Sequence, residues 1–463
     1  MFSILITRAI VAGCISAVVL TGLPAGAVAP VHPGQNGALS AREMAMAKIA
    51  WLYFQNNTQV KTGLVNAVDN YPSTTMWDTA SYLGGLVAAR ELGLVQKDEF
   101  DQRMVTLLKT FNEMSLFRDE LPNKVYHTQT AVEVDYGNKP GEIGFSALDL
   151  GRLLVWFRII KERYPEHGNA IDRAVLRWNF CRVLDGCGSM FGAYVKPDKT
   201  TGYVQEGRLG YEEYAAKGFQ LWGFDTTRAS KLEPFDVIPI FGVPVPYDTR
   251  DPRRLGAHNY VVTESYVLDG IELGFDTTLD RSTDDMKFSD AMSKEFADRI
   301  YRVQEQRYEK TGILTARTEH QLDKPPYFVY DTVYTDGYAW NTISDDGKFR
   351  PEFAAVALKG ALGLWSLWST PYTARLADAV SGMFDPKKGF YEGIYENGSG
   401  PIVAFTANNN GIILECLLYK VQGKLLKFGP PRLTVWDQAV ADLYNGRNQC
   451  LRAAQRRREC ERS

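Results

Sequence analysis

Residues 353–368 read FAAVALKGALGLWSLW, a helix-length run that is apolar on nearly every side. A helix whose apolar residues cover most of its circumference must be surrounded by other parts of the fold. Three further segments share this composition, namely 77–89, 145–156 and 411–418. All four are therefore predicted to be inner helices, whereas the highly charged segment 285–308 is predicted to lie outside them.

Helical periodicity dominates the whole chain, and strand-like pieces such as 327–333 are short. Residues that favour helix starts support the pattern, because Ser146 and Thr263 lie in the first turns of two segments and Pro351 opens another. The predicted helices are 41–55, 76–92, 97–114, 145–163, 170–180, 211–221, 260–273, 285–308, 351–368, 372–383, 409–419 and 434–444.

About twelve helices, many rich in Ala, Gly and Leu, predict an all-α fold with short β pieces, an (α/α)6 toroid of six inner and six outer helices over residues 40–425. Alternation is incomplete near 225–258, because 211–221 and 260–273 both resemble inner helices. The proline-rich segment 232–255 is predicted to be an insertion that covers one rim of the ring. The alternative is an irregular all-α fold without a ring. Residues 430–463 are predicted to form a C-terminal helical tail.

The first 27 residues have the features of a secretory signal peptide, with a short flank ending in Arg8, an apolar run and small residues through Ala27. We therefore expect a periplasmic or secreted bacterial protein. No later segment approaches the ~20 apolar residues of a membrane helix, so no stable membrane insertion is expected after cleavage. A net charge of −3 and a basic run confined to 452–462 argue against a nucleic-acid partner.

The cysteines suggest structural disulfides instead of a metal site. In an oxidising compartment, Cys181 with Cys187 and Cys450 with Cys460 are candidate pairs, because each would close a short loop. Cys416 lies in an apolar helical pattern and is predicted to be a buried free thiol. Zinc-site spacings and the HExxH, CxxC, P-loop and GxSxG motifs are absent, so we expect no metal and no cofactor.

The stretch 205–219, QEGRLGYEEYAAKGF, is the richest in chemistry. Glu206 and Glu213 bracket Arg208 and two glycines that permit a tight bend. Arg208 would hold one carboxylate ionised while another, in a drier setting, keeps its proton, and Tyr211 would offer a ring to a sugar. Such acids suit cleavage of a glycosidic bond. The alternative is a buried ion pair that fixes the loop.

Two more acids lie at predicted helix starts. Asp78 follows Trp77, and loops before inner helices of a toroid line its mouth, so Asp78 would face a sugar on which Trp77 stacks. Alternatively, Asp78 complements the helix dipole and Trp77 belongs to the core. Glu264 begins a helix that is otherwise apolar. Burial there would raise its pKa, as a general acid requires near neutral pH, although a structural capping role is the alternative.

Polar and aromatic residues near these acids are candidates for substrate binding, because amides and hydroxyls bond sugar hydroxyls and aromatic rings stack on sugar faces. Glu319 precedes an aromatic run that contains Tyr327. The further candidates are His258, Asn259, Tyr260, Asn408 and Asn410.

These motifs resemble those of the bacterial family known as domain of unknown function 3131. The resemblance is carried by 205–216, by 258–262 with Glu264, by 325–330 and by 406–411, and it covers roughly residues 41–420. The family in turn resembles (α/α)6 glycoside hydrolases that act on periplasmic β-glucans. This resemblance implies a toroidal fold and an activity on envelope polysaccharides.

The sequence thus predicts an exported glycoside hydrolase that acts on a glucan-like envelope or exopolysaccharide. Glu264 is predicted to be the general acid, Asp78 or Glu206 its partner carboxylate and Glu213 a further candidate, while Trp77, Tyr211 and Tyr327 are sugar platforms.

Two other functions remain open. A polysaccharide lyase would draw on Tyr260, His258, Asn259 and Arg208 for proton abstraction beside a uronate. A non-catalytic glycan-binding protein in polysaccharide export would bind without turnover.

Overall fold

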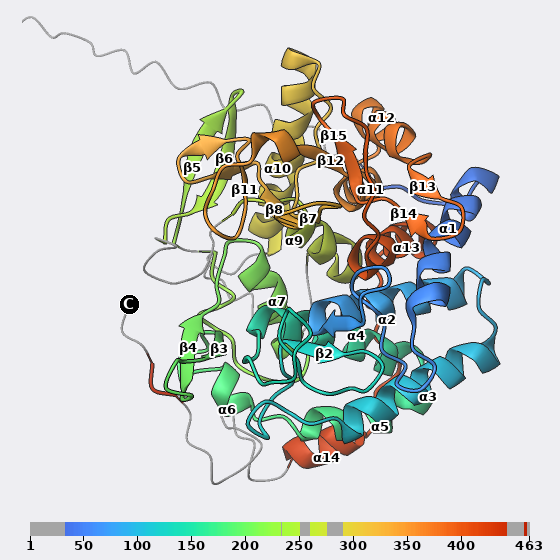
Figure 1. Ribbon diagram of the computed structural model, residues 1–463, viewed down its shortest axis with the longest axis vertical. Coiled ribbons are helices and arrows are strands. Elements are labelled where there is room, and N and C mark those ends of the chain that lie inside the picture. Colours follow the sequence, from blue (N-terminus) through green and yellow to red (C-terminus); the bar gives the residue numbers. More distant parts are fainter. Residues whose placement is uncertain (1–32, 233, 251–259, 276–289, 442–457, 461–463) are drawn as a thin grey trace, which may run out of the picture. The chain divides into compact units, whose positions relative to one another are not determined.

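Six inner helices pack side by side in a closed order (Figure 1). In this computed structural model α2 packs on α4, α4 on α7, α7 on α9, α9 on α11, α11 on α13, and α13 again on α2. The six are α2 (Met76–Glu91), α4 (Ala147–Arg163), α7 (Tyr211–Gln220), α9 (Glu264–Leu268), α11 (Leu358–Leu367) and α13 (Ala407–Gln422). The structure describes residues 33–232, 234–250, 260–275, 290–441 and 458–460.

The outer elements cover this ring. Here α1 packs on α13 and α2, α3 on α2 and α5, α5 on α4, α10 on α9, and α12 on α11. Their bounds are α1 (Ala41–Asn57), α3 (Lys97–Glu113), α5 (Gly168–Leu176), α10 (Asp290–Thr311) and α12 (Pro371–Val380). The mostly helical fold with apolar inner helices is therefore as the sequence predicted.

Burial patterns explain which helices lie inside. The outer helix α3 buries only Phe100, Met104, Leu107, Leu108 and Phe111, which recur at helical spacing along one face. The inner helix α2 is buried without interruption from Thr79 to Ala89. An amphipathic sequence thus covers the ring, and a uniformly apolar one belongs to it.

The interface between α4 and α7 depends on glycine. A Cβ on Gly218 would lie 2.0 Å from the carbonyl oxygen of Gly151, and a Cβ on Gly151 would lie 2.6 Å from the carbonyl oxygen of Ala215. A methyl group on either residue would therefore overlap the facing backbone. The absence of these side chains lets the two inner helices approach closely.

A β-hairpin lies at the predicted break in helix alternation. Strand β5 (Phe235–Ile240) pairs with β6 (Val243–Asp248), and β6 packs on α10. The end of the hairpin is joined to the loop before α7, because the Leu209 N–H donates to the Asp248 carboxylate at 3.1 Å. The hairpin is therefore tied to the segment that leads into an inner helix.

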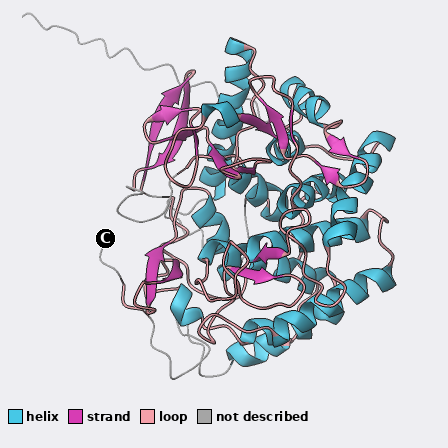
Figure 2. Cartoon of the chain, viewed as in Figure 1, coloured by secondary structure: helices cyan, strands magenta, loops and turns pink. Residues whose placement is uncertain are grey.

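The other strands are short and form small antiparallel sheets between the helices (Figure 2). The pairs are β1 with β2, β3 with β4, β9 with β10 and β13 with β14, and the three-stranded orders are β11-β8-β7 and β12-β15-β16. Their bounds are β1 (Ser73–Thr75), β2 (Val125–His127), β3 (Phe191–Val195), β4 (Thr201–Gln205), β7 (His320–Gln321), β8 (Phe328–Asp331), β9 (Tyr334–Thr335), β10 (Tyr338–Ala339), β11 (Thr342–Ile343), β12 (Ala355–Ala357), β13 (Phe384–Asp385), β14 (Gly389–Phe390), β15 (Gly393–Tyr395) and β16 (Pro401–Ile402).

Several predicted helix boundaries were wrong. The segment predicted as one helix from 351 to 368 contains a 3-10 turn (Pro351–Phe353) and strand β12 before α11 begins, because β12 pairs with β15. The segment 170–180 divides into α5 and α6 (Phe180–Val183). The helix predicted over 260–273 begins only at Glu264 and continues as the π-helical η2 (Asp269–Leu273).

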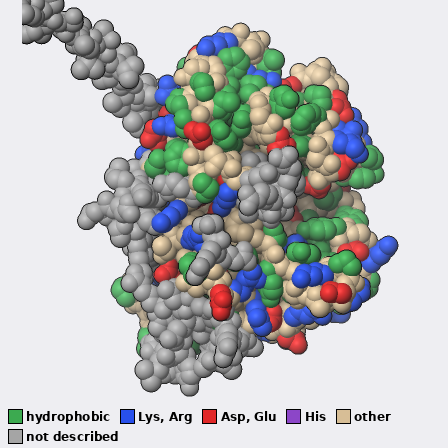
Figure 3. All heavy atoms as spheres, turned by 90° about the vertical axis from the view of Figure 1, so that its left-hand side faces the viewer, with side chains coloured by type: hydrophobic (Ala, Val, Ile, Leu, Met, Phe, Trp, Pro, Cys, Tyr) green, Lys and Arg blue, Asp and Glu red, His purple; other side chains and the backbone are tan. Residues whose placement is uncertain are grey.

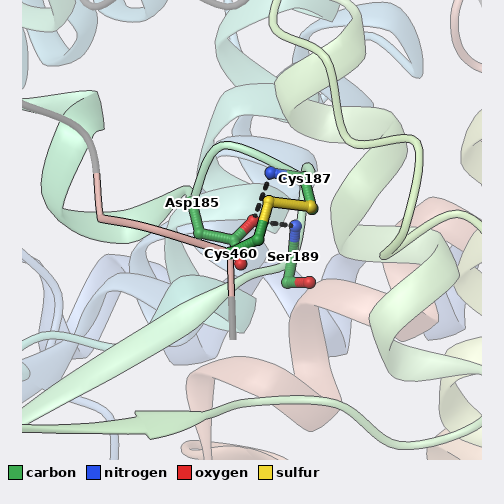
Figure 4. The surroundings of a disulfide bond; sticks show 4 residues. All are labelled: Asp185, Cys187, Ser189 and Cys460. Atoms are coloured by element: carbon green, nitrogen blue, oxygen red, sulfur yellow. Dashed lines mark hydrogen bonds between the residues drawn. A yellow bond between two sulfur atoms is a disulfide. The ribbon is translucent and has the colours of Figure 1, made fainter. Parts of the chain in front are cut away.

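A disulfide fixes the end of the chain to the turn before β3, and its pairing differs from the prediction. Cys460 is bonded to Cys187, and Cys181 is disulfide-bonded as well (Figure 4). Spacing along the chain favoured local pairs, whereas folding brings residues 273 positions apart together. The turn itself is held by Asp185, whose carboxylate accepts hydrogen bonds from the N–H groups of Cys187 and Ser189.

The remaining predictions about the ends of the chain are only partly covered. Cys416 is a buried free thiol, as predicted. The predicted signal peptide and Cys450 lie outside the described residues. In the tail, α14 (Val435–Ala441) packs on α5. Among the residues that the structure describes, no helix has the length and apolar character needed to cross a bilayer.

Candidate functional site

The first turns of five of the six inner helices supply polar or aromatic residues to one place. Trp77 of α2 and Asn408 of α13 donate hydrogen bonds to the same carboxylate oxygen of Glu264 in α9, at 3.1 and 2.9 Å. Lys359 of α11 forms an ion pair with the other oxygen. The ring of Tyr211 in α7 lies 5.6 Å from that of Trp77. The N-terminal ends of the inner helices therefore converge.

Glu264 is the centre of this cluster, but its pKa is shifted in the direction opposite to the prediction. Its residue surface is 2% exposed, and burial alone would raise its pKa. The positive charges of Lys359 and Arg152 outweigh that effect and hold the pKa of Glu264 below its ordinary value. Glu264 is therefore an ionised carboxylate at neutral pH, and it has no proton to give as a general acid.

A buried ionic network continues one turn deeper. Arg152 of α4 donates to the side chains of Ser81 and Asn408 at 2.7 and 2.9 Å and to Glu415 of α13 at 3.2 Å. Its guanidinium lies over the ring of Trp77, 4.7 Å from the ring centre. This network orients Asn408 and Trp77, which in turn hold Glu264 in place.

Asp149, in the first turn of α4, is a half-buried acid that the sequence analysis did not single out. Burial and the nearby charge of Glu206 raise its pKa to about 7. The Ser146 hydroxyl oxygen lies 3.1 Å from an oxygen of Asp149 and 2.9 Å from one of Glu206, so the two carboxyl groups approach each other closely. Asp149 is thus poised to hold a proton near neutral pH.

Glu206 is fixed at the N-terminus of α4. One of its oxygens accepts hydrogen bonds from the Ser146 hydroxyl and from the N–H groups of Ala147 and Leu148, at 2.9, 2.6 and 3.3 Å. Helix N-termini favour negative charge. Glu206 is therefore fixed beside Asp149, and its charge helps to raise the pKa of that neighbour.

Glu319 and Asp78 are two further acids with altered acidity. Burial and the charge of Glu264 raise the pKa of Glu319, although the hydroxyl of Tyr211 donates to one of its oxygens. Its other oxygen is enclosed and has no hydrogen-bond partner. Burial likewise raises the pKa of Asp78, whose carboxylate accepts a bond of 2.7 Å from Thr75. Both residues are half-buried, so each borders the solvent.

Aromatic residues lie near these acids. The ring of Tyr136 is largely exposed, but partial desolvation of its hydroxyl and the charges of Asp149 and Glu206 raise its pKa. Tyr330 packs against Tyr260 with ring centres 4.4 Å apart. Partly exposed acids, an arginine and tyrosines therefore surround one region, as carbohydrate sites require.

Some predicted site residues have other roles. Glu213 is buried and accepts a bond of 2.6 Å from the Gly210 N–H, so it caps α7. Asn410 is fully buried and bonds the backbone of Phe390 and Thr406. Both side chains are therefore bonded to the backbone inside the fold. Their sequence positions resemble those of the candidate site residues because helix caps and these residues share the same first turns.

The other predicted binding residues are placed as follows. Tyr260 is buried against Tyr330, and Tyr327 is exposed in the turn before β8. Asn408 and Arg208 are half-buried within the cluster. His258 and Asn259 lie outside the described residues.

Two other features of the described residues lie apart from this cluster. Asp101, Glu166 and His167 are close enough to share a cation, but Lys97 already pairs with both acids. A cavity of about 510 Å³ lies between the end of α4, the start of α5 and residues 428–437. Its lining includes only Glu162 and Asp437 as acids. The converging first turns therefore remain the better candidate site.

The family match covers this site completely. Residues 45–423 match the family described as "Protein of unknown function (DUF3131)". The chain belongs to this family. Among curated protein sequences, none matches it significantly.

Solved structures of similar fold are carbohydrate enzymes by their descriptions. A "putative glucoamylase" from Bacteroides caccae ATCC 43185 is 12% identical with a TM-score of 0.60, over 83% of this chain and 94% of that one. An endo-β-1,2-glucanase from Chitinophaga pinensis, solved with sophorotriose and glucose, is 14% identical with a TM-score of 0.56, over 84% and 94%. The endo-β-1,2-glucanase from Talaromyces funiculosus, solved with sophorose, gives 12% and 0.53, over 82% and 84%. At these identities the likeness is one of fold.

Proposed function

We propose that the protein is a glycoside hydrolase that cleaves a glucan-like polysaccharide of the bacterial envelope or an exopolysaccharide, after export to the periplasm or the medium. One observation carries the proposal. Acids of altered acidity are gathered there: the pKa of Asp149 is raised to about 7 and that of Glu319 is raised as well, beside Glu264, whose pKa is lowered. Acids whose pKa values are tuned by their surroundings in this way are the basis of glycosidic acid and base catalysis.

Asp149 is the proposed general acid, because it is half-buried, reaches the solvent and holds a proton near neutral pH. Glu206 is fixed beside it, and its charge helps to raise the pKa of Asp149. Glu319 is the proposed second carboxylate: its raised pKa makes it a stronger base, and one of its oxygens has no hydrogen-bond partner within the chain.

Glu264 is a positioning residue in this proposal. It receives bonds from Trp77 and Asn408 and neutralises Lys359, so it fixes three inner helices at the site. The fold-level similarity to β-1,2-glucanases suggests linear β-1,2-glucan as the first substrate to assay. That step is an analogy of fold, and the acids are the independent support.

The test is release of new reducing ends from linear β-1,2-glucan and from a panel of envelope polysaccharides and exopolysaccharides. We expect Asp149→Asn to lower kcat/KM by about 10²–10⁴-fold, because the leaving oxygen is no longer protonated. An aryl glycoside whose leaving group needs no proton should lose far less. Asp378→Asn, an exposed acid paired with Arg42, is the control and should keep full activity.

The outcomes separate the claims. If wild-type protein cleaves none of the glycans, the hydrolase proposal is refuted. If wild type cleaves one and Asp149→Asn is equally active, the acid assignment is refuted while hydrolysis stands. Unsaturated, ultraviolet-absorbing products would instead identify a lyase.

A further inference from the structure

Arg208 is a cation that the described fold leaves unmatched. Neighbouring cations have acidic partners: Arg152 bonds Glu415, and Lys359 pairs with Glu264. The side chain of Arg208 makes no hydrogen bond and no ion pair within the part of the chain that the structure describes, and its Nη1 atom is buried without a partner. Glu319 and Glu206 act on its charge only at longer range, so its N–H groups have no direct acidic partner.

The guanidinium is nevertheless held in one orientation. It lies over the ring of Tyr211, 5.2 Å from the ring centre, and over that of Tyr330, 5.7 Å away. Both tyrosines are themselves fixed, since Tyr211 donates to Glu319 and Tyr330 packs against Tyr260. An arginine stacked in this way presents its N–H groups as a rigid fork.

A buried, unpaired charge is costly unless a partner supplies hydrogen bonds. The fork of a guanidinium matches carboxylate and phosphate oxygens, which it binds with two parallel bonds. Glu319 does not fill this role. One of its oxygens accepts the Tyr211 hydroxyl, and the other has no hydrogen-bond partner in the chain. Burial also raises the pKa of Glu319 above its ordinary value.

We infer that Arg208 binds an anionic group of the substrate, so that the polysaccharide recognised by this protein carries carboxylate or phosphate substituents. The inference rests on the proposed function, because it specifies the chemical class of that same substrate. A neutral glucan would leave the guanidinium without a directly bonded anion in the complex. An anionic sugar would satisfy it beside the tyrosine rings.

The test measures binding, so it does not depend on hydrolysis. The thermal midpoint of the full chain is recorded with sodium glucuronate, with sodium phosphate, and with glucose plus sodium chloride at equal ionic strength. We expect an anion to raise the midpoint of wild type above that with glucose. The two anions distinguish the substituents. A midpoint raised by glucuronate alone would indicate a uronate, and one raised by phosphate alone would indicate a phosphoryl group.

Arg208→Gln should weaken binding of the anion that raises the wild-type midpoint by at least about tenfold. This is the loss expected when charge-assisted hydrogen bonds are removed. Arg182→Gln, which breaks a surface ion pair with Glu120, is the matched control and should bind as wild type does. If Arg208→Gln fails to fold, the wild-type preference for anions should still weaken as salt rises.

The inference is overturned if wild type responds to glucose as strongly as to both anions, or if Arg208→Gln keeps the anion response. Cleavage of neutral glucan by wild type, together with either of these results, would leave the proposed hydrolase standing and remove only the anionic substrate. Anion binding without any cleavage would support anion recognition by Arg208 and refute the proposed hydrolase.

Discussion

The ion pair between Lys359 and Glu264 allows a quantitative test of the site's electrostatics. Both residues are almost fully buried, with 4% and 2% of their surfaces exposed. Lys359→Met keeps the length of the side chain but leaves the carboxylate without its strongest counter-charge. Removing one partner of a buried pair costs about 3–5 kcal/mol. Because Arg152 also stabilises the carboxylate through space, we expect a loss near the lower limit.

The pH dependence has a definite sign. In wild type the lowered pKa of Glu264 contributes stability that is present above the unfolded value and is lost as the pH falls through the folded one. In Lys359→Met, burial dominates and raises the folded pKa above the unfolded value, so stability is lost as the pH rises. The destabilisation should therefore be smaller at about pH 4.5 than at about pH 7.

Chemical denaturation at both pH values is the assay, with Lys359→Met/Glu264→Gln completing a double-mutant cycle. The coupling between the two sites should reach about 2 kcal/mol. Lys388→Met is the control, because Lys388 pairs with Asp69 at 2.9 Å on the surface, and it should cost less than about 1 kcal/mol. A cost below about 1 kcal/mol for Lys359→Met, or equal costs at both pH values, would refute the reasoning.

Three further predictions follow from the geometry. Gly218→Ala should destabilise the fold by at least about 1–3 kcal/mol in urea titrations, because its methyl group meets the backbone of Gly151 at 2.0 Å; an unchanged midpoint would show that the helices separate easily. The kcat/KM for glycan cleavage should fall as the pH rises above about 7, as Asp149 loses its proton, and Asp149→Asn should remove that limb; a limb that persists in the variant must belong to another group. Cys460→Ser should lower the free energy of unfolding by about 2–5 kcal/mol under non-reducing conditions and by much less with reductant. Equal effects in both conditions would exclude a stabilising disulfide.

Most helices could be predicted because the local composition of each segment indicates how much of the helix is buried. The segments 76–92 and 211–221 differ from α2 and α7 by a single residue at one end. The segment 353–368 was misread at its start because Ala355–Ala357 pairs with β15, and a distant strand decides that structure. Apolar runs cannot distinguish a buried strand from a buried helix.

The site was only partly predictable for a related reason. Glu264 was found as an acid at the start of an apolar helix, but its ionisation depends on Lys359, which lies 95 positions away in the chain. Asp149 went unrecognised because Ser146-Ala147-Leu148-Asp149 reads as an ordinary helix cap. Its equivalence to Asp78, three residues after Thr75 in α2, is visible only when both helices are placed in one ring.

On the face drawn in Figure 3, basic and acidic side chains are interspersed over the described residues. That surface offers no extended field of one sign to attract a charged polymer. The proposed recognition of an anionic glycan therefore rests on Arg208 in the candidate site and not on the charge of this face.

Several groups of the candidate site occupy the opening turns of inner helices, whereas the later turns lie in the packed interior. A substitution at Trp77, Asp149 or Asn408 would change the candidate site while the rest of its helix keeps the same neighbours. Such a scaffold can exchange one specificity for another by altering a few residues spaced far apart in the gene. The same separation offers a route for redesign, in which the rim is varied and the buried framework is left untouched.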